Sequence, residues 1–190
     1  YIGFQAAFSA LQSQISEGMG DAEQFAGVEE AFKRLNDPNL LSNLRKATRG
    51  TVDDLNLMKA AVQANNFQIP IENLGNYFEF ARQRARDTGE SVDYLVQSII
   101  TGIGRKSPLI LDNLGISAVR LKEAIGGLGV ESASVGDVAQ AVGKIIQEEN
   151  AKTGQSIDGV TDQLVKNEAK WKNLRTQLAN NFLPIITNLG

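Results

Sequence analysis

Residues 102–107 are the stretch whose residue types and spacing come closest to a site for chemistry. They read Gly-Ile-Gly-Arg-Lys-Ser, a glycine-rich run with adjacent cations, which is the composition of a phosphate-binding loop. Such a loop needs glycine directly before its lysine and a second glycine five positions earlier. Arg105 precedes Lys106 instead, Ile100 occupies the earlier glycine position, and no strand-like pattern leads in. We therefore predict that Gly102 and Gly104 end a helix whose carbonyl end favours the two cations.

Three arginines at alternate positions form a second candidate. Arg82, Arg84 and Arg86 have the charge to bind phosphates, but acidic residues surround them at positions 79, 87 and 90. Mixed charges at this spacing are typical of a solvated helix face with local ion pairs. We favour that structural interpretation over anion binding.

Two pairs of adjacent carboxylates are candidates for acid–base pairs. They are Asp53 with Asp54 and Glu148 with Glu149. Neighbouring residues on a helix point in different directions, and acids at a helix N-terminus have an ordinary role at the dipole. We reject both pairs as catalytic and predict no catalytic, cofactor-binding or metal-binding residues.

Composition supports that prediction. The 190 residues include no cysteine and no histidine, so thiolate zinc sites and the commonest general base are excluded. The net charge is −3 with acids and bases mixed along the chain, which gives no electrostatic case for nucleic-acid binding. Hydrophobic residues make up 42% of the chain, enough for a core. Because the chain opens on Tyr1, we expect it to be part of a longer polypeptide.

The spacing of apolar residues predicts helices throughout. After a stop at Gly89 and a cap at Ser91, apolar residues recur with a period of 3.6 over 92–103. Ser107 with Pro108 predicts the start of a short helix that Gly115 closes. No strand-like alternation of useful length occurs, so we predict an all-α fold of about nine helices.

Other signals set the remaining boundaries. Residues 51–54 and 134–137 each match a capping box, in which a hydroxyl residue precedes an acid by three positions. The small residues of 126–136 predict a flexible loop. We divide the chain into an N-terminal helical hairpin over 1–38, a helical core over 39–155 and a long C-terminal helix over 156–190.

The C-terminal helix carries one apolar stripe and is expected to kink or end near Pro184. The stripe admits burial against this domain's own helices, which we favour, or self-association as a coiled coil. Three of its alternate seam positions are asparagine, which weakens a zipper. A narrow stripe from Phe4 to Ile15 leaves the same two options open. The predicted self-association or partner face consists of Leu164, Trp171, Leu174, Leu178 and Ile185.

A family resemblance enters at residues 88–117, which read TGESVDYLVQSIITGIGRKSPLILDNLGIS. This run closely resembles a segment of bacteriophage tail tape measure proteins. The flanks agree in KATRGTVDDLNLMKAA (46–61), GDVAQAVG (136–143) and WKNL (171–174). The resemblance covers roughly residues 40–185 of this chain.

The resemblance implies a structural, non-enzymatic protein of the virion, in the tail lumen or tail tip, and in the host cytoplasm during assembly. Such a protein sets tail length and leaves during genome delivery. Implied partners are tube, tail-tip or baseplate proteins, an assembly chaperone, the host inner membrane and further copies of the chain, with a trimer favoured. No cofactor and no specific nucleic acid is implied. The alternatives are a membrane-active channel module in DNA ejection and a tail-tip adaptor domain.

Overall fold

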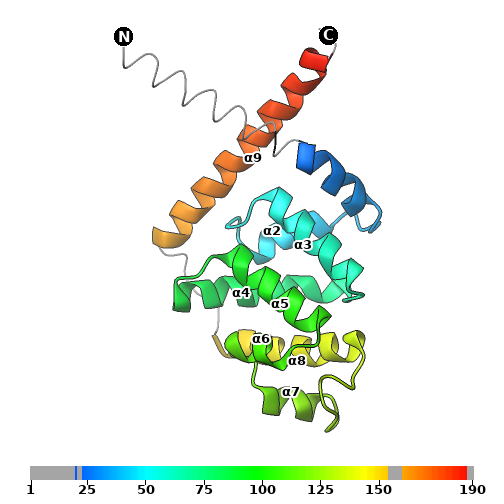
Figure 1. Cartoon of the computed structure of the whole chain (residues 1–190). Helices are drawn as coiled ribbons and strands as arrows, with labels where there is room; N and C mark the ends of the chain where they lie inside the picture. The colour runs from blue at the N-terminus through cyan, green and yellow to red at the C-terminus, as the bar shows by residue number, and fades with distance from the viewer. Residues whose placement is uncertain (1–19, 21–22, 154–159, 188–190) are drawn as a thin grey trace.

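Every element of secondary structure in the described residues is helical. The computed structural model describes residues 20, 23–153 and 160–187, with α9 lying across one end of a stack of shorter helices (Figure 1). The predicted all-α fold of about nine helices is confirmed for these residues. In chain order the elements are a helix over 23–33, α2 Leu40–Ala47, α3 Asp54–Asn66, the 3₁₀ helix η1 Ile71–Asn73, α4 Leu74–Thr88, α5 Val92–Gly104, α6 Pro108–Asn113, α7 Ala118–Ala124, α8 Val135–Thr153 and α9 Val160–Thr187.

Helices α4 and α5 form the centre of the stack. They pack against each other, while α4 also contacts α2 and α8, and α5 also contacts α3 and α6. Burial of each large aliphatic side chain contributes roughly 1.5–3 kcal/mol relative to exposure. All six apolar residues of the predicted α5 face are buried: Val92, Leu95, Val96, Ile99, Ile100 and Ile103.

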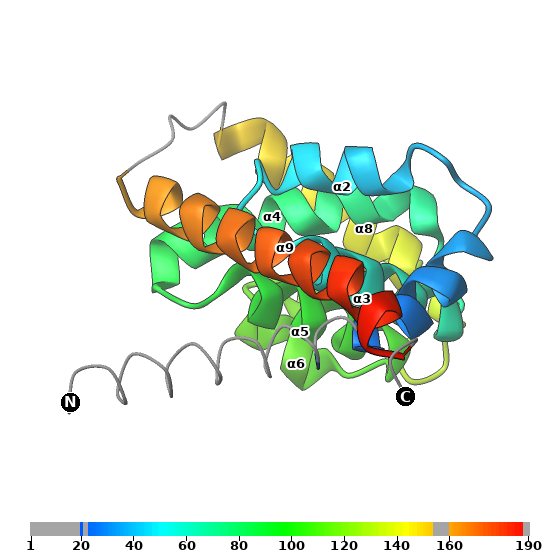
Figure 2. The same ribbon diagram turned by 90° about the horizontal axis from the view of Figure 1, so that it is seen from above.

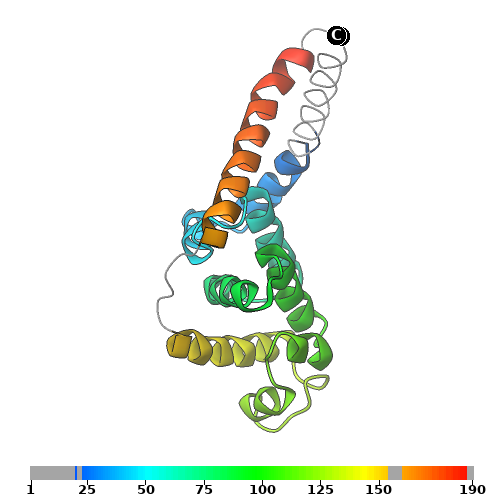
Figure 3. The ribbon, with the colours of Figure 1, turned by 90° about the vertical axis from the view of Figure 1, so that its left-hand side faces the viewer.

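The stack has a fixed order from one end to the other. Helix α9 is followed by α2 and α3, then by α4 and α5, then by α6 and α8, with α7 at the far end (Figures 1 and 3). One apolar core runs through it, with its fully buried members between Leu40 and Ile146. No described residue of α9 belongs to that core.

Side-chain caps start three of the helices where the sequence predicts them. The Ser91 hydroxyl accepts from the backbone N–H of Tyr94 at 3.2 Å, and the Ser107 hydroxyl caps α6. At α8, Ser134 and Asp137 satisfy each other's backbone N–H groups, which confirms that capping box.

Glycine ends helices in two of the predicted places. Gly89 and Gly115 have φ of 78° and 80°, in the left-handed region.

Helix α9 is the longest element. It continues through Pro184 to Thr187, so the prediction that it ends at Pro184 is wrong, while a kink there stays a prediction. Its C-terminal half extends beyond the rest of the stack (Figure 3). The side chains of α9 are described from Val165 to Asn181. The stripe from Phe4 to Ile15 lies outside the described residues.

Candidate functional site

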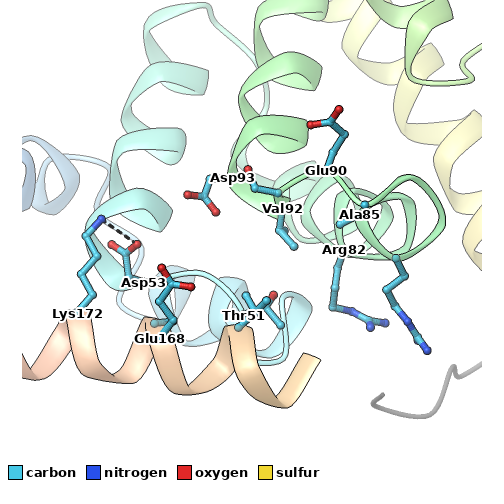
Figure 4. Close-up of a pocket in the computed structure, with 14 residues that line it drawn as sticks. Thr51, Asp53, Arg82, Ala85, Glu90, Val92, Asp93, Glu168 and Lys172 are labelled. Atoms are coloured by element: carbon cyan, nitrogen blue, oxygen red, sulfur yellow. Dashed lines mark hydrogen bonds and ion pairs between the residues drawn. The ribbon is translucent and has the colours of Figure 1, made fainter. Parts of the chain in front are cut away.

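A cleft of about 660 Å³, lined by charged and apolar side chains, lies between α9 and the body of the molecule (Figure 4). Its walls are the C-terminal end of α4, the N-terminal ends of α3 and α5, and the facing side of α9. Acidic and basic side chains both line it. It has more charged groups in its lining than a second cavity between α8 and the 124–128 turn, and we treat it as the candidate site.

The start of α3 supplies Asp53 to one end of the cleft. Its carboxylate accepts from the backbone N–H of Asn56 at 3.1 Å, so Asp53 is the N-cap of α3. The predicted capping box at Thr51 is therefore wrong by two residues. The Thr51 hydroxyl is buried and donates instead to the carbonyl of Thr48 at 2.7 Å.

A hydrogen-bonded group of polar side chains joins this cap to α5. The Asn56 side-chain amide donates to Asp53 at 2.8 Å and to Asp93 at 3.1 Å. Burial raises the pKa of the Asp93 carboxyl, the neighbouring charges of Asp53 and Glu168 add to the rise, and Lys172 opposes it. Figure 4 shows Asp53 and Asp93 on the wall formed by the body, with Glu168 on α9 opposite them.

Helix α9 is joined to this group by two polar contacts. The Lys172 ammonium lies 3.2 Å from the Asp53 carboxylate, and the Asn173 side-chain oxygen accepts from the backbone N–H of Asp54 at 3.0 Å. The second contact satisfies one of the N–H groups that a helix N-terminus leaves open. Neither contact was predicted, because both join positions 119 apart in the sequence and follow no local pattern.

The basic side of the cleft corrects the prediction for the three arginines. Arg82 is 1% exposed rather than solvated, and Arg86 also lines the cleft. Arg84 points elsewhere, with its guanidinium 5.1 Å from the centre of the Phe80 ring. The split follows from helix geometry, since positions i and i+4 share a face and position i+2 lies nearly opposite. The three arginines therefore form no common phosphate-binding face.

In the run at 102–107, the predicted helix end is confirmed, since α5 ends at Gly104 and Arg105 is its C-cap, but neither glycine is the left-handed residue that closes it. Helix α5 includes both Gly102 and Gly104, and the residue with a left-handed φ is Lys106, at 51°. The glycines instead allow close approach: a Cβ on Gly104 would lie 2.3 Å from the Phe67 ring, and one on Gly102 2.8 Å from Leu111. The two glycines therefore lie at the end of α5 and also meet a packing requirement that the local sequence pattern does not reveal.

The cations after these glycines include one with a structural role. The Lys106 ammonium donates to the carbonyl oxygens of Glu131 and Ala133, at 2.8 and 3.1 Å. Val130 and Ala133 are buried in the same loop. These contacts anchor the 126–136 loop, and its predicted flexibility stays a prediction.

The adjacent carboxylates are engaged in ion pairs. Asp54 accepts two hydrogen bonds from Arg45, at 2.7 and 2.8 Å. Glu148 and Glu149 both bind Arg120, at 2.7 and 2.6 Å, and Arg120 lowers the pKa of Glu149. Their different directions on α8 do not keep them apart, because the forked guanidinium reaches both.

The predicted partner face of α9 is exposed in the structure. Trp171, Leu174 and Leu178 are 55%, 45% and 48% exposed, so the favoured expectation of burial within the chain is wrong for these three. The side of α9 that is covered carries small residues: Ala169, Thr176 and Ala179 are 7%, 5% and 9% exposed. The side chains of Leu164 and Ile185 lie outside the described ones.

Membrane-spanning helices and metal-ligand clusters do not occur in the described part of the chain. None of its helices combines the length and the apolar character that crossing a bilayer requires. No cluster of three or more potential metal ligands occurs among the same residues. The charged and polar side chains at the cleft hold α9 against the body through the Lys172–Asp53 ion pair and the hydrogen bond to Asn173.

Comparison of the chain with protein-family models, curated proteins and solved structures finds no match in any of the three.

Proposed function

We propose that this chain is a structural part of a bacteriophage tail, a segment of the tape measure protein that sets tail length and is released during genome delivery. The observation that carries the proposal is the run at 88–117 with its agreeing flanks. In the fold, this run comprises the end of α4, all of α5 and all of α6. It is the part of the chain around which the core is built.

The state of the polar groups fits a structural role. The acidic and basic residues singled out from the sequence serve as caps, ion pairs and helix attachments. None of the pairs proposed from the sequence faces an open pocket as a matched acid and base. This supports the proposal without depending on the resemblance.

The fold also bears on where in a tail such a segment resides. A rod-like ruler would show uninterrupted heptads. Breaks between the helices of the body are frequent instead, and the body packs as a globule. We hypothesise that it folds compactly where the tail bore widens or after release, and is stretched into separate helices inside the tube.

The test is a change of tail length. An in-frame duplication of residues 23–153 in the parent gene is made, and tails of purified particles are measured by electron microscopy. Stretched helices at 1.5 Å per residue would lengthen the tail by roughly 200 Å. A duplication of a similar length of a tail-fibre gene serves as the control.

The outcomes are distinct. Longer tails that contain the chain by mass spectrometry support the proposal. A clearly smaller increase would show that the segment stays compact within the tube and would overturn the stretching hypothesis alone. Unchanged tail length, with the chain missing from particles, would overturn the tape measure proposal.

A further inference from the structure

The exposed face of α9 is an apolar surface that no described part of the chain covers. Trp171, Leu174 and Leu178 are each about half exposed, and their spacing of three and four places them on one side of the helix. Ala169 and Thr176, which are buried, lie on the opposite side, toward the body. A row of large apolar side chains on one helix face, unlike single scattered ones, marks a site of contact with another surface.

The side chains that flank this row indicate what it contacts. Glu168 and Arg175 lie along one edge of the row, and Lys170 lies along the other. Glu168 is exposed, and its charge and that of Asp93 repel each other across the cleft. An edge with an acid and a base one heptad apart is complementary to itself when two such helices run in opposite directions.

We propose that this face binds a second copy of the chain, with the two α9 helices packed antiparallel. A two-fold axis between Lys172 and Asn173 places Trp171 of each copy opposite Leu174 of the other. These two apolar pairs form the centre of the contact, because all four residues lie within one helical turn of the axis. The buried side of α9 faces the body, so the body of each copy lies away from the contact.

The charges along the edges of the row select the antiparallel orientation. About the same axis, Glu168 of each copy lies beside Arg175 of the other, which gives two identical ion pairs. The Arg175 guanidinium has five N–H donors and can bind this acid in addition to other partners. In a parallel pair, Arg175 would instead lie beside Lys170 of the other copy, and these like charges repel.

The same charges also fix the register of the two helices. Sliding one helix by a heptad keeps the apolar positions in the seam but changes the pairs along its edges. In one direction Glu168 would face Glu168 of the other copy, and in the other direction Arg175 would face Arg175. Of these three registers, only the one centred between Lys172 and Asn173 pairs opposite charges.

The contact is small, so the association should be weak. Three half-exposed side chains per copy bury much less area than a standard interface, and the next seam pair, Leu178 with Asn167, is not wholly apolar. We expect a dissociation constant in the micromolar range or above. The inference stands independently of the proposed function, since it uses only spacing, exposure and charge on α9.

Trp171 is the only tryptophan in the chain, so its fluorescence reports directly on the contact. Sedimentation gives the mass of the full chain from submicromolar to millimolar concentration, and the emission wavelength is recorded in parallel. We expect a monomer–dimer equilibrium in which the emission shifts to shorter wavelength as the dimer forms. Leu174→Asp should be a monomer at every concentration, because it would bury a charge in the seam. Val119→Asp, at an exposed apolar position on α7, should behave as the unaltered chain.

Charge reversals test the orientation. Glu168→Arg and Arg175→Glu should each weaken the dimer about 3- to 30-fold, because each places like charges at two contacts. An equimolar mixture of the two variants should associate about as tightly as the unaltered chain, since opposite charges meet again. In a parallel pair, Arg175→Glu would instead strengthen the dimer by pairing with Lys170. Circular dichroism checks that each variant keeps its helices.

Three kinds of result would overturn the inference. A monomer at every concentration would show that no second copy binds, and protection of Trp171 in that monomer would assign the cover to its own chain. A dimer that Leu174→Asp does not weaken would use a different surface. Strengthening by Arg175→Glu, or a mixture of the two reversals that associates no better than either alone, would rule out the antiparallel arrangement.

Discussion

At the residue scale, Gly104 packs so closely against Phe67 that no side chain larger than hydrogen fits at position 104. Replacing Gly104 by alanine would place a Cβ 2.3 Å from the Cγ atom of Phe67, so the Phe67 ring would have to move. We expect Gly104→Ala to lower the free energy of unfolding by about 1–3 kcal/mol, as overpacking does. Urea unfolding measures this.

Gly75→Ala is the matched control. Gly75 lies within α4, and a Cβ there would meet nothing within 4 Å. Alanine is the better helix former, so this variant should be as stable as the original or up to about 1 kcal/mol more stable. Equal effects of the two substitutions would show that Gly104 is not a packing requirement.

Tyr77 provides a pH-dependent prediction. Its buried hydroxyl donates to the Ala139 carbonyl at 2.7 Å, and burial raises the pKa of the phenol well above its usual value. The folded state then keeps a proton that the unfolded chain releases above about pH 10, so this contribution to stability is present below pH 10 and falls as the pH rises further.

The variant Tyr77→Phe isolates this contribution. At neutral pH it should cost about 1 kcal/mol for the lost hydrogen bond. Above pH 10 its stability should fall less steeply than that of the original chain, so the difference between them narrows. Tyr94→Phe, at an exposed position, should leave the pH dependence unchanged. If the free energy of unfolding falls equally with pH in the original chain and in Tyr77→Phe up to pH 11, the Tyr77 phenol does not cause the pH dependence.

Residue roles were predictable where they depend on neighbours in the sequence. Ser91, Ser107 and Ser134 cap helices as expected, because a cap is decided within four residues. Asp53 was missed because Thr51 offers an equally good local pattern. Its own hydroxyl is drawn to the Thr48 carbonyl instead. Arg82 was misassigned because burial of a charged residue depends on elements far along the chain.

At the element scale, α9 is attached to the body although none of its described residues belongs to the apolar core. Its contacts with the body include the Lys172–Asp53 ion pair, the hydrogen bond from Asp54 to Asn173, and a side of small residues. The large apolar residues on α9 suggested the opposite orientation. Small side chains permit close approach of a helix while leaving the polar contacts to fix its position. A hydrophobic pattern alone cannot reveal this arrangement.

We expect the double variant Lys172→Met with Asn173→Ala to loosen α9 without unfolding the body. A partly exposed ion pair and one hydrogen bond together contribute about 1–2 kcal/mol, which corresponds to exchange of α9 amides about 5- to 30-fold faster. Hydrogen exchange followed by mass spectrometry measures this. Amides of α5 and α8 serve as internal references and should keep their rates.

Lys170→Met is the matched control for the charge change. Lys170 is exposed on the same helix and should leave exchange in α9 unaffected. Faster exchange of α9 in this variant as well would mean that overall charge, not the contact with Asp53, decides its attachment. Faster exchange throughout the double variant would instead show that α9 is part of the cooperative core.

At the scale of the whole molecule, the separation between the apolar core and helix α9 determines the shape in solution. The core runs through α2 to α8, and the described part of α9 contributes no residue to it. The predicted boundary between a core over 39–155 and a helix over 156–190 falls in residues 154–159, outside the described ones, and stays a prediction. The all-α class was readable because helical spacing and breakers are local. The direction in which α9 leaves the body was not, since it depends on the contacts at Asp53 and Asp54.

This separation leads to a prediction for X-ray scattering. A compact chain of 190 residues has a radius of gyration of about 16 Å, and a compact one of 134 residues about 14 Å. Helix α9 spans 28 residues, about 42 Å at 1.5 Å per residue, and half of it projects beyond the stack (Figure 3). The radius of gyration of the full chain should therefore exceed about 16 Å. That of the chain of residues 20–153 should equal the compact value of about 14 Å. Because that shorter chain keeps the whole described core, it should also melt in one cooperative transition. A full chain at the compact value would mean that α9 lies flat on the body in solution. If the shorter chain shows no cooperative melting, α9 is needed for the core to form, and the body does not fold independently of α9.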